Sequence, residues 1–155
     1  MGAGDEAAAA PPPSVFDRLG AKPPAAELLG WQLVAFDQEG GRARLGFSGR
    51  PEFANPTGHV QGGFLAAMLD EAMGSALIIA TDGGFLSTTI SMSTDFIRPA
   101  PVGPIEAEGR VVSLGKSIAF LEGSLRSAGG KLVARATASC KLVAMNPERI
   151  AKPDG

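Results

Sequence analysis

The feature that most constrains the fold is an apolar stretch from Gly62 to Ala80 that holds only two charged residues, Asp70 and Glu71. A helix that is apolar on every side belongs in a protein core, because no face of it is suited to water. The stretch is long enough to cross a membrane, but two adjacent carboxylates near its middle would be costly in a bilayer. We therefore expect a buried helix, about 28 Å long, around which the other elements fold.

Composition excludes several classes of protein. The chain has 155 residues, of which 45% are hydrophobic and 19% charged, with a net charge of −2. These values predict one globular domain without the basic face that nucleic acid requires, and we expect no membrane association. The single cysteine, Cys140, cannot form an internal disulfide, and the N-terminus lacks the basic region of a signal peptide, so we expect a cytoplasmic protein. One cysteine and one histidine predict no metal site.

The ends of the chain are predicted from their composition. Residues 1–13 are of low complexity and are expected to be a disordered tail. We place the domain at residues 14–147 and a C-terminal tail at 148–155. Ser14 is predicted to cap a short helix that runs through Leu19. A second short helix is predicted from Pro23 or Pro24 to Gly30.

From Trp31 onward, apolar and polar residues alternate, which predicts β-strands. The expected strands cover residues 31–37 and 42–48, joined by a hairpin at Glu39-Gly40-Gly41, and then 86–98, 105–113, 118–126 and 132–142. In the third of these, Ile90, Met92, Thr94 and Phe96 are predicted to share one face. Tight turns between strands predict antiparallel pairing. The expected class is α+β: a curved antiparallel sheet of five or six strands wrapped around one long central helix.

These features resemble a known family. The chain contains the segment Gln61-Gly62-Gly63, the acid Asp70 eight residues after Gly62, and the later sequences FIRPAP and GKSIAF. These motifs and the order of the elements are similar to those of the hotdog-fold acyl-CoA thioesterases. The similarity covers about residues 30 to 145, and it is closest to the phenylacetate-pathway and human thioesterase superfamily member 2 type. It implies hydrolysis of an acyl-CoA by a homodimer or a dimer of dimers, without a cofactor. Gln61 stands where the family has a histidine, and His59 lies two residues too early to replace it.

The resemblance implies that the amide of Gly62 or Gly63 binds the thioester carbonyl oxygen. The first amides of a helix have no partner within it and lie at the positive end of its dipole, which suits an oxyanion. The alternative is that the two glycines only permit a tight turn or close packing.

Asp70 is implied to be the catalytic base or nucleophile, with Glu71 as the second choice. The two side chains point about 100° apart on a helix, so at most one is expected to be deeply buried. A buried, unpaired acid is costly and is rarely without a role. The alternative is that both acids lie on a solvent-facing stripe.

The resemblance gives roles to three further polar residues. Asn55 is implied to hold the attacking water or the acyl oxygen, although an Asx turn before Pro56 explains it equally well. Gln61 can form hydrogen bonds but cannot titrate near neutral pH. Thr89, with Thr88 as the next choice, is implied to lie near the substrate, or is an ordinary strand residue. His59 is expected to order the loop rather than to act as a base.

Coenzyme A is implied to bind the turn formed by Gly115, Lys116 and Ser117, with Arg98 and Lys141 as further cationic candidates. Each cation could instead be a solvated surface charge. The acyl group is expected to contact an apolar wall near Phe64, Met68, Met73, Ile90 and Phe96.

One geometric argument predicts a dimer. Gly62 and Asp70 are about 12 Å apart along one helix, whereas a thioester carbonyl must lie within about 3 Å of both its oxyanion donor and the attacking oxygen. The two groups are therefore expected to come from different subunits, whose helices run antiparallel across a two-fold axis. The alternatives to a thioesterase are a hotdog hydratase or dehydratase and a non-catalytic acyl-CoA-binding protein.

Overall fold

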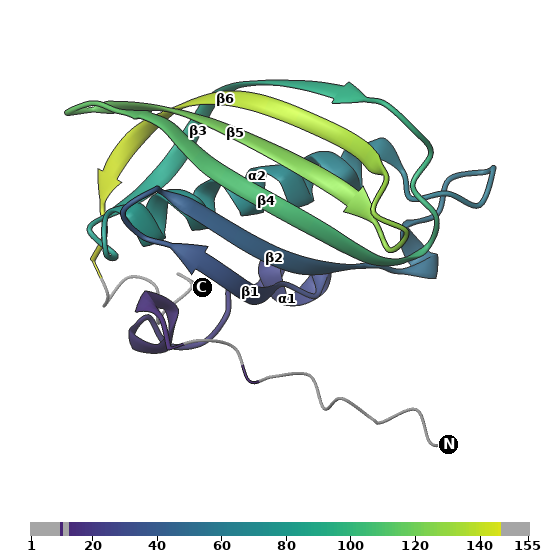
Figure 1. Cartoon of the computed structure of the whole chain (residues 1–155), viewed down its shortest axis with the longest axis horizontal. Helices are drawn as coiled ribbons and strands as arrows, with labels where there is room; N and C mark the ends of the chain where they lie inside the picture. The colour runs from purple at the N-terminus through teal and green to yellow at the C-terminus, as the bar shows by residue number, and fades with distance from the viewer. Residues whose placement is uncertain (1–9, 11–12, 147–155) are drawn as a thin grey trace, which may run out of the picture.

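The computed structural model describes residues 10 and 13–146, so both predicted tails, apart from residues 10 and 13, lie outside the described residues. The long helix α2 spans Gly62–Ala80, as predicted. Six strands accompany it: β1 (Gln32–Asp37), β2 (Arg42–Gly49), β3 (Phe85–Phe96), β4 (Gly103–Leu114), β5 (Ile118–Ser127) and β6 (Leu132–Ala144). The predicted α+β class is confirmed, and the sheet arches over α2 (Figure 1).

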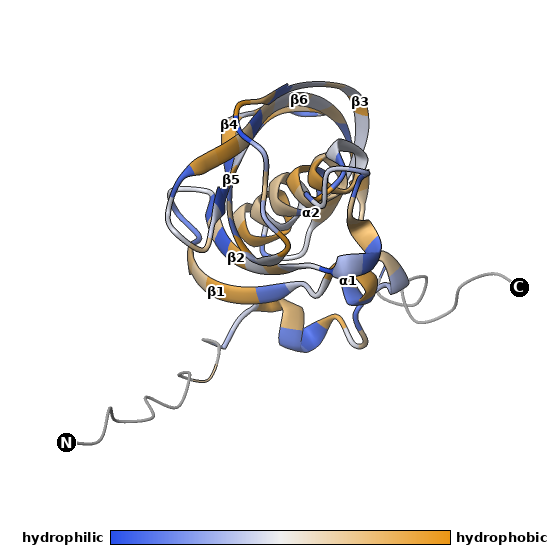
Figure 2. Cartoon of the chain, turned by 90° about the vertical axis from the view of Figure 1, so that its right-hand side faces the viewer, coloured by the Kyte–Doolittle hydropathy of each residue, from blue (hydrophilic) through white to orange (hydrophobic). Residues whose placement is uncertain are grey.

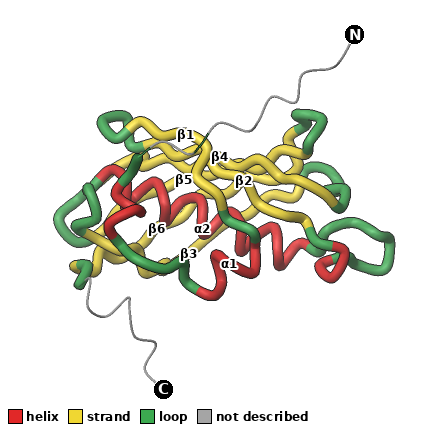
Figure 3. The backbone as a smooth tube through the Cα atoms, turned by 90° about the horizontal axis from the view of Figure 1, so that it is seen from below, coloured by secondary structure: helices red, strands yellow, loops and turns green. Residues whose placement is uncertain are grey.

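The six strands form one antiparallel sheet in the order β1-β2-β4-β5-β6-β3. Strand β3 precedes β4 in the chain but pairs only with β6, so β1 and β3 are the two edges of the sheet. Seen along the helix, the sheet curves around α2 (Figure 2). Seen from below, α2 lies across the concave side of the sheet with the short helix α1 (Pro24–Leu29) beside it (Figure 3).

The N-terminal segment folds as two short helices before the sheet begins. The Ser14 side chain caps the first of them, as predicted, but the helix is a 3-10 turn, η1, over Val15–Arg18, rather than an α-helix through Leu19. Helix α1 ends at Gly30, which adopts the left-handed conformation with φ 70°. The ring of Phe16 meets that of Trp31 edge-on at 4.9 Å. This contact ties the segment to the start of β1.

Helix α2 packs closely against the sheet at two points, and at the first of them there is no room for a side chain. A Cβ on Gly109 of β4 would lie 2.0 Å from the carbonyl oxygen of Ala72, and one on Gly123 of β5 would lie 3.1 Å from the Met73 side chain. Leu69, Met73 and Leu77 are fully buried by this contact. By length and apolarity α2 could also cross a membrane, but here it is the core helix of the domain.

One strip of α2 is not covered by the sheet. Gly63, Ala67 and Asp70 follow each other at helical spacing and are exposed. The prediction that every face of this helix is buried is therefore wrong for the strip within a single chain. A six-stranded sheet cannot close completely around a helix, and the strip lies on the open side.

Strand β3 departs from regular alternation at Ile90. Thr89 pairs with Cys140 and Ser91 with Ser139, which leaves Ile90 as an extra residue in a β-bulge. Its side chain is 61% exposed, so its predicted place on the inner face is wrong. Because partners across a ladder share a face, Thr89 points inward with the buried Cys140. After the bulge, Met92, Thr94 and Phe96 share the inner face, as predicted.

The close approach of α2 to β4 predicts a large cost for a small substitution. Gly109→Ala places a methyl group against a backbone oxygen that cannot rotate away, and we expect a loss of about 3 kcal/mol of unfolding free energy. Gly46→Ala on β2 is the matched control, because a Cβ there meets nothing within 4 Å. Urea unfolding of both variants measures the difference, and equal stabilities would contradict the packing described here.

Candidate active site

Two cavities lie along α2, and they share no lining residue. The first, which we call the carboxylate cavity, has a volume of about 310 Å³ and includes Asp70 and Glu71. The second, the loop cavity, has a volume of about 360 Å³ and includes Asn55, Gly62 and Arg98. The predicted site residues that line a cavity are therefore divided between two places on the chain.

In the carboxylate cavity, Asp70 is held by a threonine from the edge strand. The Thr89 hydroxyl donates a hydrogen bond of 2.7 Å to Asp70 Oδ1. The bulge at Ile90 makes this contact possible, because it leaves Thr89 rather than Thr88 facing the helix. Asp70 is exposed in the single chain. The expectation of a buried, unpaired acid at this position is thus wrong on both counts.

Glu71 is the more buried of the two acids. Burial raises the pKa of the Glu71 carboxyl above its usual 4.5, and the negative charge of Asp70 raises it further. Among the described residues its carboxyl has no hydrogen-bond or ion-pair partner. Two adjacent carboxylates therefore differ in environment. Asp70 is exposed and accepts a hydrogen bond, whereas Glu71 is half-buried, and its burial favours the protonated form.

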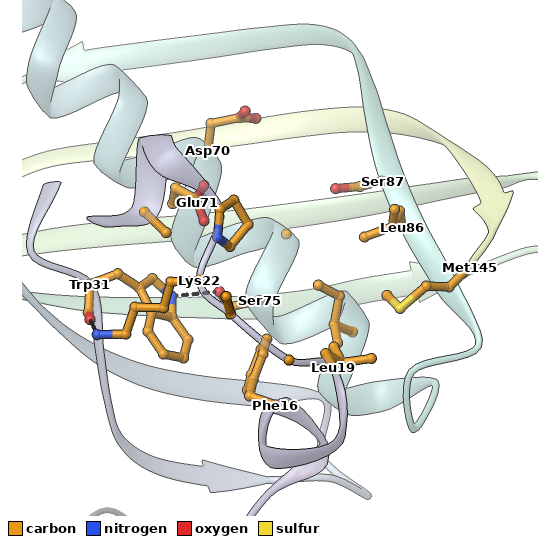
Figure 4. A pocket seen from close by; sticks show the side chains of 16 residues that line it. Phe16, Leu19, Lys22, Trp31, Asp70, Glu71, Ser75, Leu86, Ser87 and Met145 are labelled. Atoms are coloured by element: carbon orange, nitrogen blue, oxygen red, sulfur yellow. Dashed lines mark hydrogen bonds between the residues drawn. The ribbon is translucent and has the colours of Figure 1, made fainter. Parts of the chain in front are cut away.

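The remainder of the carboxylate cavity is mostly apolar (Figure 4). Its polar wall includes Ser75, which is 3% exposed and accepts a 3.0 Å hydrogen bond from the Trp31 indole nitrogen. Lys22 donates to the Trp31 carbonyl oxygen at 2.9 Å, so the ammonium closes one side. The apolar lining comes from both ends of the chain and from α2 and β3: Phe16, Leu19, Trp31, Ile78, Leu86 and Met145.

The five residues of the predicted acyl wall are not brought together at one cavity of a single chain. Met68 and Met73 are fully buried between α2 and the sheet and line neither cavity. Phe64 instead stacks on Phe53 with ring centroids 4.1 Å apart, and Ile90 points outward from its bulge. Of the five residues expected there, only Phe96 lines a cavity, and that is the loop cavity.

One wall of the loop cavity comes from residues 54–61, which precede α2 and which we call the Asn55 loop; the other walls come from α2 and from residues 96–100. Backbone bonds hold it at both ends: Gln61 N donates to Phe53 O at 2.8 Å, and Val60 N donates to Ala100 O at 2.9 Å. The FIRPAP segment noted in the sequence thus supplies the support for this loop. Its position relative to the first turn of α2 is fixed as a result.

The first two amides of α2 are available to a ligand. Phe64 N and Leu65 N both donate to the Gln61 carbonyl oxygen, whereas in the described part of the chain the amides of Gly62 and Gly63 have no partner. The Gln61 side chain lies over Gly63, where its Oε1 would be 2.9 Å from a Cβ. Gly62 faces the Phe96 ring at 3.3 Å, measured from an ideal Cβ.

Asn55 forms the Asx turn that its place before Pro56 predicted. Its Oδ1 accepts hydrogen bonds from the Thr57 amide at 3.0 Å and from the His59 amide at 3.1 Å. Asn55 also lines the loop cavity, so the turn and a ligand-binding role are compatible.

The predicted coenzyme A residues are not brought together in one chain. Arg98 lines the loop cavity and donates to the Leu132 carbonyl oxygen at 2.9 Å. Gly115, Lys116 and Ser117 form the exposed turn between β4 and β5. This turn lies at the opposite end of the sheet from the Asn55 loop (Figure 1), and it lines neither cavity.

The comparison with known proteins agrees with this geometry. Residues 57–134, half of the chain, match the family model described as the thioesterase superfamily. The chain belongs to the thioesterase superfamily. The matched residues contain the first turn of α2, both acids and the Thr89 strand. They end within β6.

Individual relatives support the same assignment. A protein of Saccharolobus solfataricus that is named as an esterase is 30% identical over 65% of this chain and 71% of its own. A phenylacetic acid degradation-related protein of Ralstonia eutropha, named as a thioesterase, has a TM-score of 0.77 at 32% identity, covering 83% of this chain and 99% of its own. A Streptococcus mutans protein solved with acetyl-CoA has a TM-score of 0.65 at 19% identity, covering 75% and 90%; it shows the fold alone. The fold of this thioesterase-superfamily chain is the predicted hotdog fold.

Sequence reasoning missed the carboxylate cavity beyond its acids. Phe16, Leu19 and Met145 come from segments that carry no motif, and only the folded chain brings them to α2. One signal was available: Glu71 and Ser75 are four residues apart, so they share a helix face with a polar character unusual in this stretch. That spacing could have indicated a polar wall facing a cavity.

The raised pKa of Glu71 predicts a pH-dependent stability. A carboxyl whose pKa is raised by folding stabilises the folded state fully below its unfolded pKa, near 4.5, and this contribution is lost as the pH rises through the folded pKa. Glu71→Gln stays neutral at every pH. We expect its melting temperature to exceed that of the wild type at pH 7 and the gap to close as the pH approaches 4.5.

Scanning fluorimetry between pH 4 and pH 8 would measure this effect. Glu106→Gln is the control, because it removes the same charge from an exposed glutamate on the outer face of β4. A gap for Glu71→Gln that stays constant with pH would contradict the assigned cause.

Proposed function

We propose that this protein is an acyl-CoA thioesterase that hydrolyses an aryl- or medium-chain acyl-CoA to the free acid and coenzyme A. In this proposal the carbonyl oxygen binds the amides of Gly62 or Gly63 of one subunit. Asp70 of the other subunit attacks the carbonyl carbon or activates the water that does so. Membership of the thioesterase superfamily and the acetyl-CoA held by the Streptococcus mutans neighbour support the choice of substrate.

The observation that carries the proposal is the division of the chemistry between two cavities. The free amides of Gly62 and Gly63 belong to the first turn of α2, and Asp70 lies about 12 Å further along the helix in a cavity with no shared lining residue. A carbonyl group cannot reach both on one chain. Two antiparallel copies of α2 would place the carboxylate of one copy beside the amides of the other.

The proposed reaction uses water, the first amides of α2 and the Asp70 carboxylate with its Thr89 partner. Water, with its proton accepted by Asp70, adds to the carbonyl carbon, and the negative charge moves to the carbonyl oxygen at the helix amides. The tetrahedral intermediate then breaks its C–S bond, and the coenzyme A thiolate leaves and takes up a proton. In the alternative, Asp70 itself adds to the carbonyl carbon, the C–S bond breaks with loss of the coenzyme A thiolate to leave a mixed anhydride, and water hydrolyses that anhydride to the free acid and the Asp70 carboxylate. The Thr89 hydroxyl orients the carboxylate in either case.

Two uncovered surfaces support a dimer. Strand β3 is an edge with an unpaired backbone and with Ile90 and Phe96 exposed, and the strip of α2 that contains Gly63 and Ala67 lies on the same open side. Pairing through β3 would cover both. A dimer of dimers is proposed from a second patch on the outer face of the sheet, where Phe120 and Val143 are exposed apolar residues.

The carboxylate cavity supports an apolar acyl group of moderate size. Its volume of about 310 Å³ lies at the lower end of the range for small-molecule sites. Trp31 and Phe16 offer aromatic surface, and Leu19, Ile78 and Leu86 offer aliphatic surface. The N-terminal segment forms one wall, so we propose that it limits the length of the acyl group.

The first test of the proposal is the acid. Asp70→Asn keeps the size of the side chain but removes its charge, and we expect kcat for an acyl-CoA panel to fall about 10²-fold or more. Release of free thiol from acetyl-, hexanoyl-, decanoyl- and phenylacetyl-CoA measures the rate. Asp95→Asn, an exposed aspartate on β3 paired with Arg135, is the control for the loss of one carboxylate. Unchanged hydrolysis by Asp70→Asn would exclude the assigned acid, and a wild type that binds acyl-CoA without turnover would favour the non-catalytic alternative.

A second test addresses the shared site. Gly62→Val and Asp70→Ala proteins should each be inactive, but a mixed dimer has one site with an intact Gly62 and an intact Asp70. With statistical exchange, half of the dimers are mixed and half of their sites work, so about a quarter of the wild-type rate should return. Native mass spectrometry confirms the exchange. Exchange without recovery would contradict the two-subunit site.

A further inference from the structure

The Asn55 loop contains a chain of side-chain hydrogen bonds that the proposed reaction does not yet use. In addition to the two backbone amides, Asn55 Oδ1 accepts a 2.7 Å hydrogen bond from the Thr57 hydroxyl. Thr57 Oγ1 in turn lies 3.1 Å from Nδ1 of His59. Three residues of one short loop thus form a chain that ends on a side chain of the loop cavity.

The direction of each bond follows from the number of protons available. A carboxamide oxygen has no proton to give, so the single hydroxyl proton of Thr57 is directed to Asn55 Oδ1. The Thr57 oxygen can then only accept from His59, which requires the proton of the neutral imidazole to be on Nδ1. The chain runs from His59 Nδ1–H to the Thr57 hydroxyl to Asn55 Oδ1.

This chain determines what Asn55 can offer to a ligand. With three donors, Oδ1 has no remaining acceptor capacity. Among the described residues the Nδ2 group has no partner, so its two N–H groups are what remains for the loop cavity. The two ends of a carboxamide have nearly the same shape, and only hydrogen bonding decides which end faces which way. A flipped Asn55 would present an oxygen, which repels a carbonyl oxygen instead of binding it.

We propose that the side chains of Thr57 and His59 are positioning groups that, together with the two backbone amides on Oδ1, hold the Asn55 carboxamide with its N–H groups toward the loop cavity. Their effect on catalysis rests on the proposed function, since it requires a substrate oxygen or water at that cavity. The backbone supports the same geometry: Asn55 N donates to His59 O at 2.7 Å, and Gly58 N donates to Asn55 O at 2.9 Å. The loop backbone therefore keeps its path when a side-chain link is removed. An effect on the Asn55 carboxamide can thus be separated from an effect on the loop backbone.

Two pairs of variants test the chain. Thr57→Val removes the hydroxyl at constant shape, whereas Thr57→Ser keeps it. His59→Asn places an amide N–H where Nδ1 lies, whereas His59→Gln places one where Nε2 lies. We expect kcat to fall about tenfold to a hundredfold in Thr57→Val and His59→Gln, because a misplaced group can cost up to about 10² in rate. Thr57→Ser and His59→Asn should stay within about threefold of the wild type, since the link to Asn55 is kept.

Further readouts distinguish positioning from other roles. The double variant Thr57→Val/His59→Gln should be no slower than Thr57→Val alone, because both break one chain. Thr137→Val, an exposed threonine on the outer face of β6, controls for the loss of a hydroxyl. Melting temperatures of all variants should match that of the wild type. If His59→Asn is as slow as His59→Gln, His59 acts as a base and the proposal is overturned.

A measurement without substrate keeps this test independent of the proposed function. Nitrogen-15 NMR of the imidazole at a pH where it is neutral should show His59 protonated on Nδ1 in the wild type. Thr57→Val should shift the side-chain amide signals of Asn55, and Thr57→Ser should restore them. An Nε2–H tautomer, or Asn55 signals unmoved by Thr57→Val, would overturn the chain. If the wild type hydrolyses no acyl-CoA, the proposed function fails while these signals still decide the hydrogen bonds.

Discussion

The architecture depends on how closely α2 and the sheet approach each other. At Gly109 the carbonyl of Ala72 occupies the space of a methyl group, and at Gly123 the side chain of Met73 nearly does. This contact lets a six-stranded sheet reach around one helix and bury Leu69 and Leu77 completely. It also fixes which side of α2 stays outside the sheet. The acids lie toward that side because the opposite one has no room for them.

The helix therefore acts as both core and scaffold. Its buried side packs against the sheet, its first turn carries two amides without a partner among the described residues, and its uncovered side carries Asp70 beside Thr89. The N-terminal segment completes the carboxylate cavity: η1 and the residue after it contribute Phe16 and Leu19, and α1 contributes Ala26. Stability and chemistry are thus distributed on different faces of one element. Substitutions on one face need not disturb the other.

Local signals explain why so much of the fold could be predicted. The bounds of α2, the hairpin at Gly40-Gly41 and the small inward residues of β6 follow from periodicity and turn chemistry, which depend only on near neighbours. The cavities do not follow from such local signals. The walls near Trp31 and Met145 come from distant segments, and the degree to which Asp70 and Glu71 are covered depends on what packs above them. The motif residues were found as a set, but their division between two cavities needed the folded chain.

The bulge at Ile90 shows why the curvature of a sheet is difficult to predict from the sequence. Val34 in β1 and Val112 in β4 occupy the same kind of position, skipped by the ladder and largely exposed. A bulge bends its strand and increases its twist, so each of these β-branched residues marks a place where the sheet turns around α2. They contribute to the shape of the sheet rather than to either of its faces. Deleting Ile90 would thus leave Thr89 and Met92 on the inner face. The strand would lose its bend, but the same side chains would still face the helix.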